Sequence, residues 1–190
     1  MMTPSGRFGL CVLFALSIAG CTTIRSRAFL PAFGSEWILK GIRQVGPEDL
    51  WQEHRDGGNL YIQNGCAGEI LGDFRHRTRP WMIRSSVFDQ STPEGARALF
   101  DQRRRTADAA PGGLEILDES MYLMTAPDLR SWIIGFSLGK YFVEATLTEE
   151  ADPEQPMDGA AREALLDFAQ RMAATLETGT PDNRIRPEVG

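Results

Sequence analysis

Hydrophobic and polar residues alternate along much of the chain between residues 66 and 147, which is typical of antiparallel strands with one buried face. The clearest alternation runs over 132–147, where two arms flank Gly139 and Lys140 as the turn of a hairpin. A short apolar run after Glu36 predicts one more strand. The predicted strands cover residues 37–41, 66–77, 81–89, 114–117, 121–125, 132–138 and 141–147.

Two longer segments have the 3.6-residue period of helices instead. Between Asp158 and Thr178, apolar residues follow one another by four, three, four and four positions, which forms one stripe able to pack on a sheet. A second helix is predicted from Ser91 to about Arg105, with Ser91 and Glu94 at the spacing of a capping box. The stripe of the C-terminal helix consists of Ala161, Leu165, Phe168, Met172 and Leu176.

A shorter helix is predicted near residue 50, with Leu50, Trp51 and His54 on one face. Gly57 is expected to end this helix, because glycine enters the left-handed conformation without a steric penalty. Residues 59–63 fit either a further helical turn or a strand.

The order of these elements is strands, helix, strands and helix, which predicts an α+β fold. We expect a twisted antiparallel sheet of about five to seven strands with two to three helices packed on one face. Residues 21–190 number 170, a usual length for one domain. The predicted organisation is a signal peptide at 1–20, a lipidated cysteine and tether at 21–35, a single α+β domain at 36–178 and a flexible tail at 179–190.

The N-terminal segment has the pattern of a secretory signal. Arg7 precedes 13 residues that are all apolar or small, whereas a transmembrane helix needs roughly 20. This run ends in Ile18-Ala19-Gly20-Cys21, which resembles the lipobox of bacterial lipoproteins. An ordinary signal peptide, with Cys21 as merely the first mature residue, is the alternative interpretation.

The lipobox resemblance implies acylation of Cys21, with diacylglycerol and usually a further palmitate-type chain, and cleavage just before it. Two or more chains give stable anchoring. The expected location is the cell envelope, on the periplasmic face of the outer membrane, because Thr22 stands where an aspartate would indicate retention in the inner membrane. The expected partners are the membrane, through this anchor, and an envelope protein.

The net charge and the number of cysteines restrict which partners and which disulfides the sequence predicts. Residues 1–20 contain one arginine and no acidic residue, so the mature chain has 19 Lys and Arg against 26 Asp and Glu, a net charge of −7. A nucleic-acid partner is therefore not expected. Cys11 leaves with the signal and Cys21 carries lipid, so Cys66 has no intramolecular partner. Cys66 is interpreted as a small buried residue, with a reactive thiol as the alternative.

The sequence Gly135-Phe136-Ser137-Leu138-Gly139 matches the G-x-S-x-G pattern of a serine-hydrolase nucleophile elbow, which requires a strand, a sharp turn and a helix. Here the following residues alternate as a strand. Both histidines, His54 and His76, also precede Ser137, opposite to the order in α/β-hydrolases. We therefore interpret Ser137 as a strand residue and predict no catalytic residues.

Metal and anion sites are weakly indicated. His54 and His76 stand 22 residues apart without further ligands at short spacing, so neither a metal site nor a cofactor is predicted. The arginines at 75, 77 and 79, together with those at 103–105, are suited either to phosphate and acidic lipid head groups or to a solvated surface.

Several short motifs are similar to a family of bacterial secreted and lipoprotein domains, over residues 36–177. Members often carry Gly-Gly-Ala-Glu-Leu-Tyr, whereas this chain has Asn59 in place of the Ala-Glu pair. The resemblance implies no activity. Its motifs are Leu50-Trp51, Asp56-Gly57-Gly58-Asn59-Leu60-Tyr61, Phe88-Asp89-x-Ser91-x-Pro93-x-x-Ala96-x-x-x-Phe100 and Gly139-Lys140-Tyr141-x-Val143.

The candidate ligand-binding residues are Trp51, Asp56, Gly57, Gly58 and Tyr61. The alternative for the Asp-Gly-Gly sequence is a helix stop in which Asp56 bonds nearby backbone N–H groups. The sequence thus predicts a membrane-anchored envelope lipoprotein that acts as a non-enzymatic binding or accessory module. A periplasmic envelope hydrolase is the alternative function.

Overall fold

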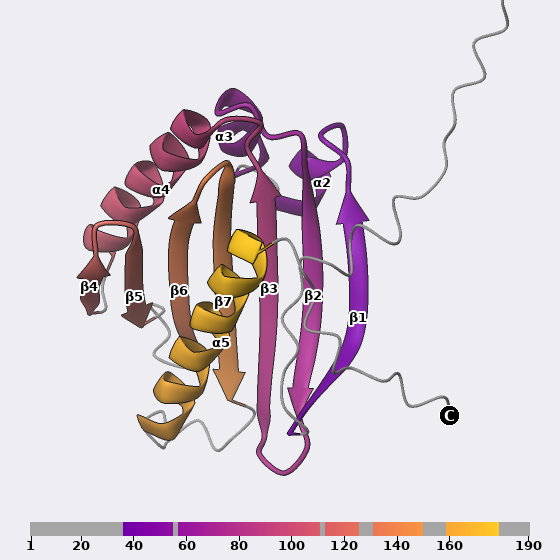
Figure 1. Ribbon diagram of the computed structural model, residues 1–190, viewed down its shortest axis with the longest axis vertical. Helices are drawn as coiled ribbons and strands as arrows, with labels where there is room; N and C mark the ends of the chain where they lie inside the picture. The colour runs from indigo at the N-terminus through magenta and orange to yellow at the C-terminus, as the bar shows by residue number, and fades with distance from the viewer. Residues whose placement is uncertain (1–35, 55–56, 111–112, 126–130, 150–158, 179–190) are drawn as a thin grey trace, which may run out of the picture.

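A computed structural model describes residues 36–54, 57–110, 113–125, 131–149 and 159–178. Within these residues seven strands form one sheet in the order β1-β2-β3-β7-β6-β5-β4, and all neighbouring strands are antiparallel (Figure 1). The strands are β1 (Trp37–Val45), β2 (Gly68–His76), β3 (Trp81–Asp89), β4 (Leu114–Asp118), β5 (Met121–Thr125), β6 (Ser131–Leu138) and β7 (Tyr141–Glu149). The helices are α2 (Leu50–His54), α3 (Gly58–Gln63), α4 (Pro93–Asp108) and α5 (Gly159–Thr178).

The α+β class and the antiparallel sheet predicted from the sequence are confirmed. The hairpin predicted over 132–147 is the pair β6–β7, and Gly139 in its turn has a φ of 53°, a conformation that favours glycine. β3 pairs with β7 and joins the two groups of strands into one sheet. Among the described residues, no helix is both long and apolar enough to cross a membrane. The predicted signal peptide, Cys21, the tether and the tail lie outside the described residues.

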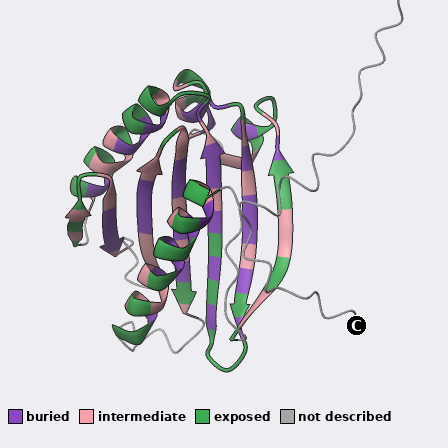
Figure 2. Ribbon diagram, viewed as in Figure 1, coloured by how far each residue is buried: buried purple, intermediate pink, exposed green. Residues whose placement is uncertain are grey.

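Helices cover both faces of the sheet, whereas the sequence pattern predicted one. α5 packs on one face and lies over β6 and β7 (Figure 1), while α2, α3 and α4 pack on the other. The central strands are buried or half-buried along most of their length (Figure 2), and adjacent residues such as Phe142 and Val143 belong to opposite cores. A strict alternation of apolar and polar residues identifies only one buried face, whereas the central strands have two.

The apolar stripe predicted for the last helix is confirmed in α5. Leu165, Phe168 and Met172 are all 0% exposed, and the Phe168 ring meets Phe74 of β2 edge-on with 5.6 Å between centroids. α5 therefore holds β2, β3, β6 and β7 together from one side.

The helix predicted from Ser91 is present, but its predicted start and cap are wrong. α4 begins at Pro93, and its N-cap is Thr92, whose hydroxyl oxygen accepts the Gly95 N–H at 3.1 Å. Ser91 is not the cap. It has a φ of 62° and donates its hydroxyl hydrogen to the Gly65 carbonyl at 2.9 Å.

The predicted left-handed stop at Gly57 is also wrong. Gly57 has φ −75° and ψ −22°, and it precedes α3 as a right-handed residue. A second helix follows α2 so closely that this glycine starts a helix instead of ending one. The ambiguous segment 59–63 is helical.

The first two strands differ from their predicted limits. β1 continues to Val45, and a bulge between Leu39 and Gly41 interrupts its alternation. β2 begins at Gly68, so Cys66 precedes the strand and lies in the core opposite to that of Phe74.

Candidate functional site beside α2

On the face that carries α2, α3 and α4, charged side chains of the first three strands reach the surface beside α2. Strand pairing places Arg43 opposite Leu71 and Asp73 opposite Arg84. Leu71 and Asp73 are two residues apart in β2 and therefore share a face. The side chains of Arg43 and Arg84 are 59% and 68% exposed.

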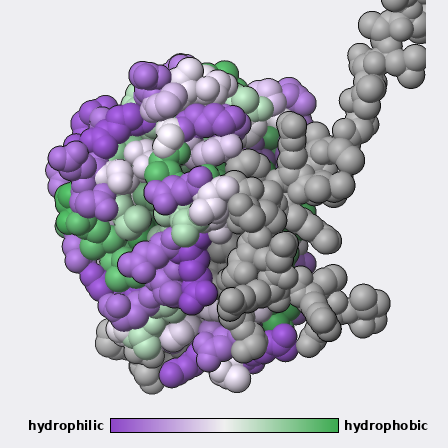
Figure 3. Space-filling view, in the orientation of Figure 1, coloured by the Kyte–Doolittle hydropathy of each residue, from purple (hydrophilic) through white to green (hydrophobic). Residues whose placement is uncertain are grey.

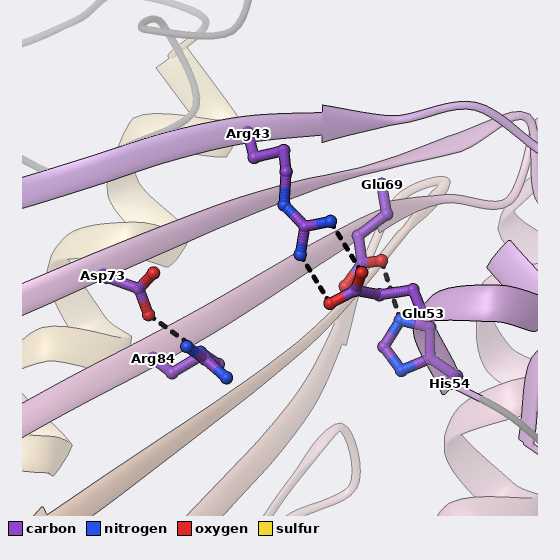
Figure 4. Close-up of polar contacts among 6 residues, drawn as sticks. All are labelled: Arg43, Glu53, His54, Glu69, Asp73 and Arg84. Atoms are coloured by element: carbon purple, nitrogen blue, oxygen red, sulfur yellow. Dashed lines mark hydrogen bonds and ion pairs between the residues drawn. The ribbon is translucent and has the colours of Figure 1, made fainter. Parts of the chain in front are cut away.

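Three acid–base pairs form here (Figure 4). Arg43 donates to both carboxylate oxygens of Glu53, at 2.5 and 2.6 Å. Arg84 Nε donates to Asp73 Oδ1 at 2.8 Å, and His54 Nε2 lies 2.7 Å from Glu69 Oε2. We call these residues the α2 network: Arg43, Glu53, His54, Glu69, Asp73 and Arg84.

The three pairs influence one another. The hydrogen bond between Arg43 and Glu53 raises the pKa of Arg43 and lowers the pKa of Glu53. Weaker charge effects on the pKa of Arg43 come from Glu69 and Asp73, and weaker effects on the pKa of Glu53 come from His54 and Arg84. The three pairs are therefore close enough for their charges to interact.

Glu69 is the buried member of the network, since only 1% of the residue is exposed. Its Oε2 bonds His54, whereas its Oε1 is buried without a hydrogen-bond partner among the described residues. A carboxylate can accept about four hydrogen bonds, and burial of one that is poorly satisfied costs several kcal/mol. Glu69 thus has an unused acceptor in an unfavourable place, which is a feature of functional sites.

Aromatic rings surround the His54–Glu69 pair. The His54 ring lies 4.9 Å from Tyr61 and 5.5 Å from Phe88, between ring centroids. Tyr61 and Phe88 stack on each other at 4.2 Å with 7° between planes. The imidazole is therefore held between a carboxylate and a pair of stacked rings.

Gly58, a predicted ligand contact, is buried against α2 instead. A Cβ atom at Gly58 would lie 2.3 Å from Trp51 Cα, so only glycine permits this approach of the two helices. A Cβ atom at Gly57 would meet nothing closer than 3.8 Å. Of the two glycines, one is required by packing and the other is not.

The other predicted ligand-binding residues are separated by the fold. Tyr61 is 4% exposed, and burial raises the pKa of its hydroxyl. Trp51 is 57% exposed and points away from the core, although it was predicted to share a face with Leu50 and His54. Asp56 lies outside the described residues. Trp51 therefore remains the accessible member of the predicted set among those that are described.

Residues from three of the short motifs noted in the sequence meet at the end of β3. Phe88 lies between Tyr61 and Phe142, and Lys140 Nζ forms an ion pair with Asp89 Oδ2 at 2.5 Å. Ser91 bonds Gly65, as described above. These motif residues explain how three distant segments pack together, and they do not form a separate site.

The network itself was not predicted from the sequence. The alternation around Glu69 indicated a solvent-facing residue, because it points away from Ile70 and Phe74. That side of β2 is covered by α2 and α3, which local patterns do not reveal. The only signal available was an acidic residue within an apolar strand, with a histidine in a nearby helix.

The contacts of His76 are those of a residue that stabilises the fold. It is 7% exposed, and its Nδ1 accepts the backbone N–H groups of Thr78 and Arg79 at 3.2 and 3.0 Å. It packs against Trp37 and Trp81, in the core opposite to His54. Within the described residues, no group of three or more His, Cys, Asp or Glu side chains is placed to hold a metal ion.

Arginines of the two groups noted in the sequence make different contacts. Arg103 donates to both oxygens of Glu144 at 2.6 to 2.9 Å and ties α4 to β7. Arg79 lies over the Trp81 ring at 5.2 Å. The half-buried guanidinium of Arg103 is therefore bonded to Glu144 and is not free for a surface anion.

Cys66 is buried, as expected. It is 6% exposed, and its thiol donates to the Gly68 carbonyl at 3.3 Å. Burial raises its pKa to about 11. The nucleophilic thiolate is therefore scarce at neutral pH.

Ser137 lies within β6, opposite Phe142 of β7. The chain continues through a tight turn into a strand, so the strand–turn–helix geometry of a nucleophile elbow is absent at Ser137 and its interpretation as a strand residue is confirmed. We expect no labelling by fluorophosphonates and a change below about 0.5 kcal/mol in unfolding free energy for Ser137→Ala. Stoichiometric labelling at Ser137, lost in the alanine variant, would contradict this and favour a hydrolase.

Comparison with known proteins reveals similarity in fold alone. No protein-family model and no curated protein matches the chain. Among solved structures, the extracellular domain of PknH from Mycobacterium tuberculosis superposes with a TM-score of 0.50 at 7% sequence identity, covering 83% of this chain and 92% of that one. The two domains share their architecture over nearly the whole of the PknH domain.

Proposed function

We propose that this protein is a lipid-anchored lipoprotein of the cell envelope, exposed on the periplasmic face of the outer membrane, whose domain is a non-enzymatic binding module. The lipobox sequence ending at Cys21 supports the anchor, and Thr22 supports the outer membrane. The PknH domain that shares this fold is extracellular, which agrees with a position outside the cytoplasm.

The ligand of this module binds at the α2 network. The observation that carries this proposal is Glu69, because a buried carboxylate oxygen without a partner is costly for stability alone. Trp51 stands one turn before His54 in α2 and is 57% exposed. A large exposed aromatic residue next to a polar network is typical of binding surfaces.

Cys21→Ala should abolish incorporation of labelled palmitate and leave the protein unprocessed, or cleaved elsewhere and released from the membrane fraction. The reason is that the thiol is the acceptor for the diacylglyceryl group that anchoring requires. Cys66→Ala is the matched control, since it removes a buried thiol and leaves the lipobox intact. Normal membrane attachment of Cys21→Ala would contradict the anchor.

Binding near α2 can be tested by photo-crosslinking in cells. A benzoylphenylalanine at position 51 should form adducts with one envelope component, identified by mass spectrometry. The same group at Ile116 is the control, because Ile116 is 49% exposed on β4 and hydrophobic side chains also reach the surface on that side (Figure 3). Equal adducts at both positions, or none at position 51, would contradict a binding surface beside α2.

A further inference from the structure

We infer that Glu69 binds a guanidinium group of the ligand, which takes the place of the His54 imidazole. This inference rests on the proposed binding at the α2 network and adds the chemical class of the bound group. It follows from the charge balance of the network, the unused oxygen of Glu69 and the surroundings of His54.

The network has an excess of negative charge. Two arginines, Arg43 and Arg84, face three carboxylates, those of Glu53, Asp73 and Glu69, and the third carboxylate has only the His54 imidazole beside it. Each arginine already has its own carboxylate partner, at 2.5 and 2.8 Å. The unbalanced charge is therefore that of Glu69, and a cation is the complementary ligand.

An anion or a metal ion fits this place less well. An anion would have to displace a carboxylate from Arg43 or Arg84 and would increase the negative excess. A zinc ion would need three or more ligating side chains, and the described part of the chain does not assemble such a group. A single organic cation needs only a carboxylate and a suitable cavity wall.

The surroundings of the imidazole are those preferred by guanidinium. His54 Nε2 donates to the carboxylate, because a carboxylate can only accept, and its ring lies against Tyr61 and Phe88. A guanidinium group is planar, donates two parallel N–H groups to one carboxylate and packs well against aromatic rings, which here stand at 54–55° to the imidazole. It can therefore bond both Oε2 and the unused Oε1, whereas the imidazole bonds Oε2 alone.

Of the His54–Glu69 pair, His54 is the residue whose side chain is better placed to move. Its side chain is 20% exposed while that of Glu69 is 0% exposed, and His54 is the last residue of a five-residue helix. Binding of a guanidinium group requires that the imidazole rotate into solvent while the sheet stays in place. In the free domain, His54 thus occupies the position of the ligand group.

The test is a titration of the mature lipidated protein in detergent micelles with N-acetyl-arginine methylamide and with agmatine, followed by NMR of the imidazole nitrogens. The His54 signals should shift on binding of at least one probe, and those of His76, in the opposite core, should not. Agmatine alone would indicate a small guanidinium compound as the source, and the arginine amide would indicate a protein side chain. No His54 shift with either probe, or tighter binding of inorganic phosphate, would overturn the inference.

Two substitutions should act in opposite directions. Glu69→Gln keeps the shape and a bond to His54 but removes the charge, and should weaken binding at least about tenfold, because charge-assisted hydrogen bonds are the stronger ones. His54→Ala removes the competing imidazole and should tighten binding, measured by calorimetry. Asp167→Asn, which removes the exposed partner of Arg171 in α5 on the opposite face of the sheet, is the control and should change affinity by less than about threefold. Unchanged binding in Glu69→Gln, or lost binding in His54→Ala, would overturn the inference.

The same variants separate this inference from the proposed function. If Glu69→Gln keeps the crosslinks at position 51 and neither probe binds, the binding surface stands and the guanidinium assignment is wrong. If the crosslinks are absent from the wild type as well, the binding surface itself is wrong. Should Glu69→Gln fail to fold, the direction of the His54→Ala effect decides the assignment.

Discussion

Phe168→Ala is expected to lower the free energy of unfolding by about 3–5 kcal/mol, as removal of a buried phenyl ring from a packed core does. Phe168 is 0% exposed and its ring packs edge-on against Phe74. A domain of this size has only about 5–15 kcal/mol of total stability, so this one change would remove a large share of it. Urea denaturation followed by tryptophan fluorescence measures the effect.

Gln170→Ala is the matched control, because Gln170 lies in the same helix and is exposed. It should change stability by less than about 0.5 kcal/mol. If Phe168→Ala unfolded at the same urea concentration as the wild type, α5 would not pack on the sheet as described. The two substitutions together separate loss of core packing from a general effect on the helix.

The elements predicted well from the sequence are those whose pattern is local. The arms of β6 and β7 alternate on either side of a glycine turn, and the stripe of α5 repeats over about four helical turns, a spacing that only a helix satisfies. The local sequence does not determine which face of the sheet each helix covers. Val87 and Phe88 are both buried, and nothing near them in the sequence tells which helix packs on which side.

The α2 network depends on contacts between segments that are still further apart in the sequence. The bulge between Leu39 and Gly41 shifts the register of β1, so that Arg43 pairs with Leu71 and shares its face. Without that extra residue, Arg43 would point to the α5 side. Glu69 and His54 are brought together only by the turn between α3 and β2 and by the packing of α2 on the sheet. Sequence patterns of period two or 3.6 contain none of this.

The motif that contains the predicted ligand-binding residues has a role in packing. It marks the segment that carries His54 and covers Glu69, because a close packing of α2 and α3 requires glycine at position 58. Its individual residues were assigned by type, and type alone does not distinguish a glycine needed for packing from a glycine needed for ligand access. A pair of substitutions makes that distinction.

Gly58→Ala should destabilise the domain by about 3 kcal/mol, the upper part of the usual range for overpacking. The new methyl group would stand 2.3 Å from Trp51 Cα, 2.7 Å from Trp51 N and 2.8 Å from the Leu50 carbonyl oxygen. All three are backbone atoms, so the strain can be relieved only by separating α3 from α2, which carries Glu53 and His54. Chemical denaturation measures the loss, and the NMR signals of the His54 imidazole report the displacement of α2.

Gly57→Ala is the matched control and should have the opposite sign. Gly57 has a right-handed φ of −75°, and a Cβ atom there meets only His54 Cβ and Tyr61 Cε2, both at 3.8 Å. Alanine at a position whose conformation suits it stabilises by about 0.4–1 kcal/mol, because the unfolded chain has fewer conformations to lose. If the two glycines formed a ligand-binding loop, both substitutions would instead weaken crosslinking at position 51 while leaving stability unchanged. Equal effects of the two changes on stability would contradict the packing of α3 on α2 and, with it, the position of His54 over Glu69.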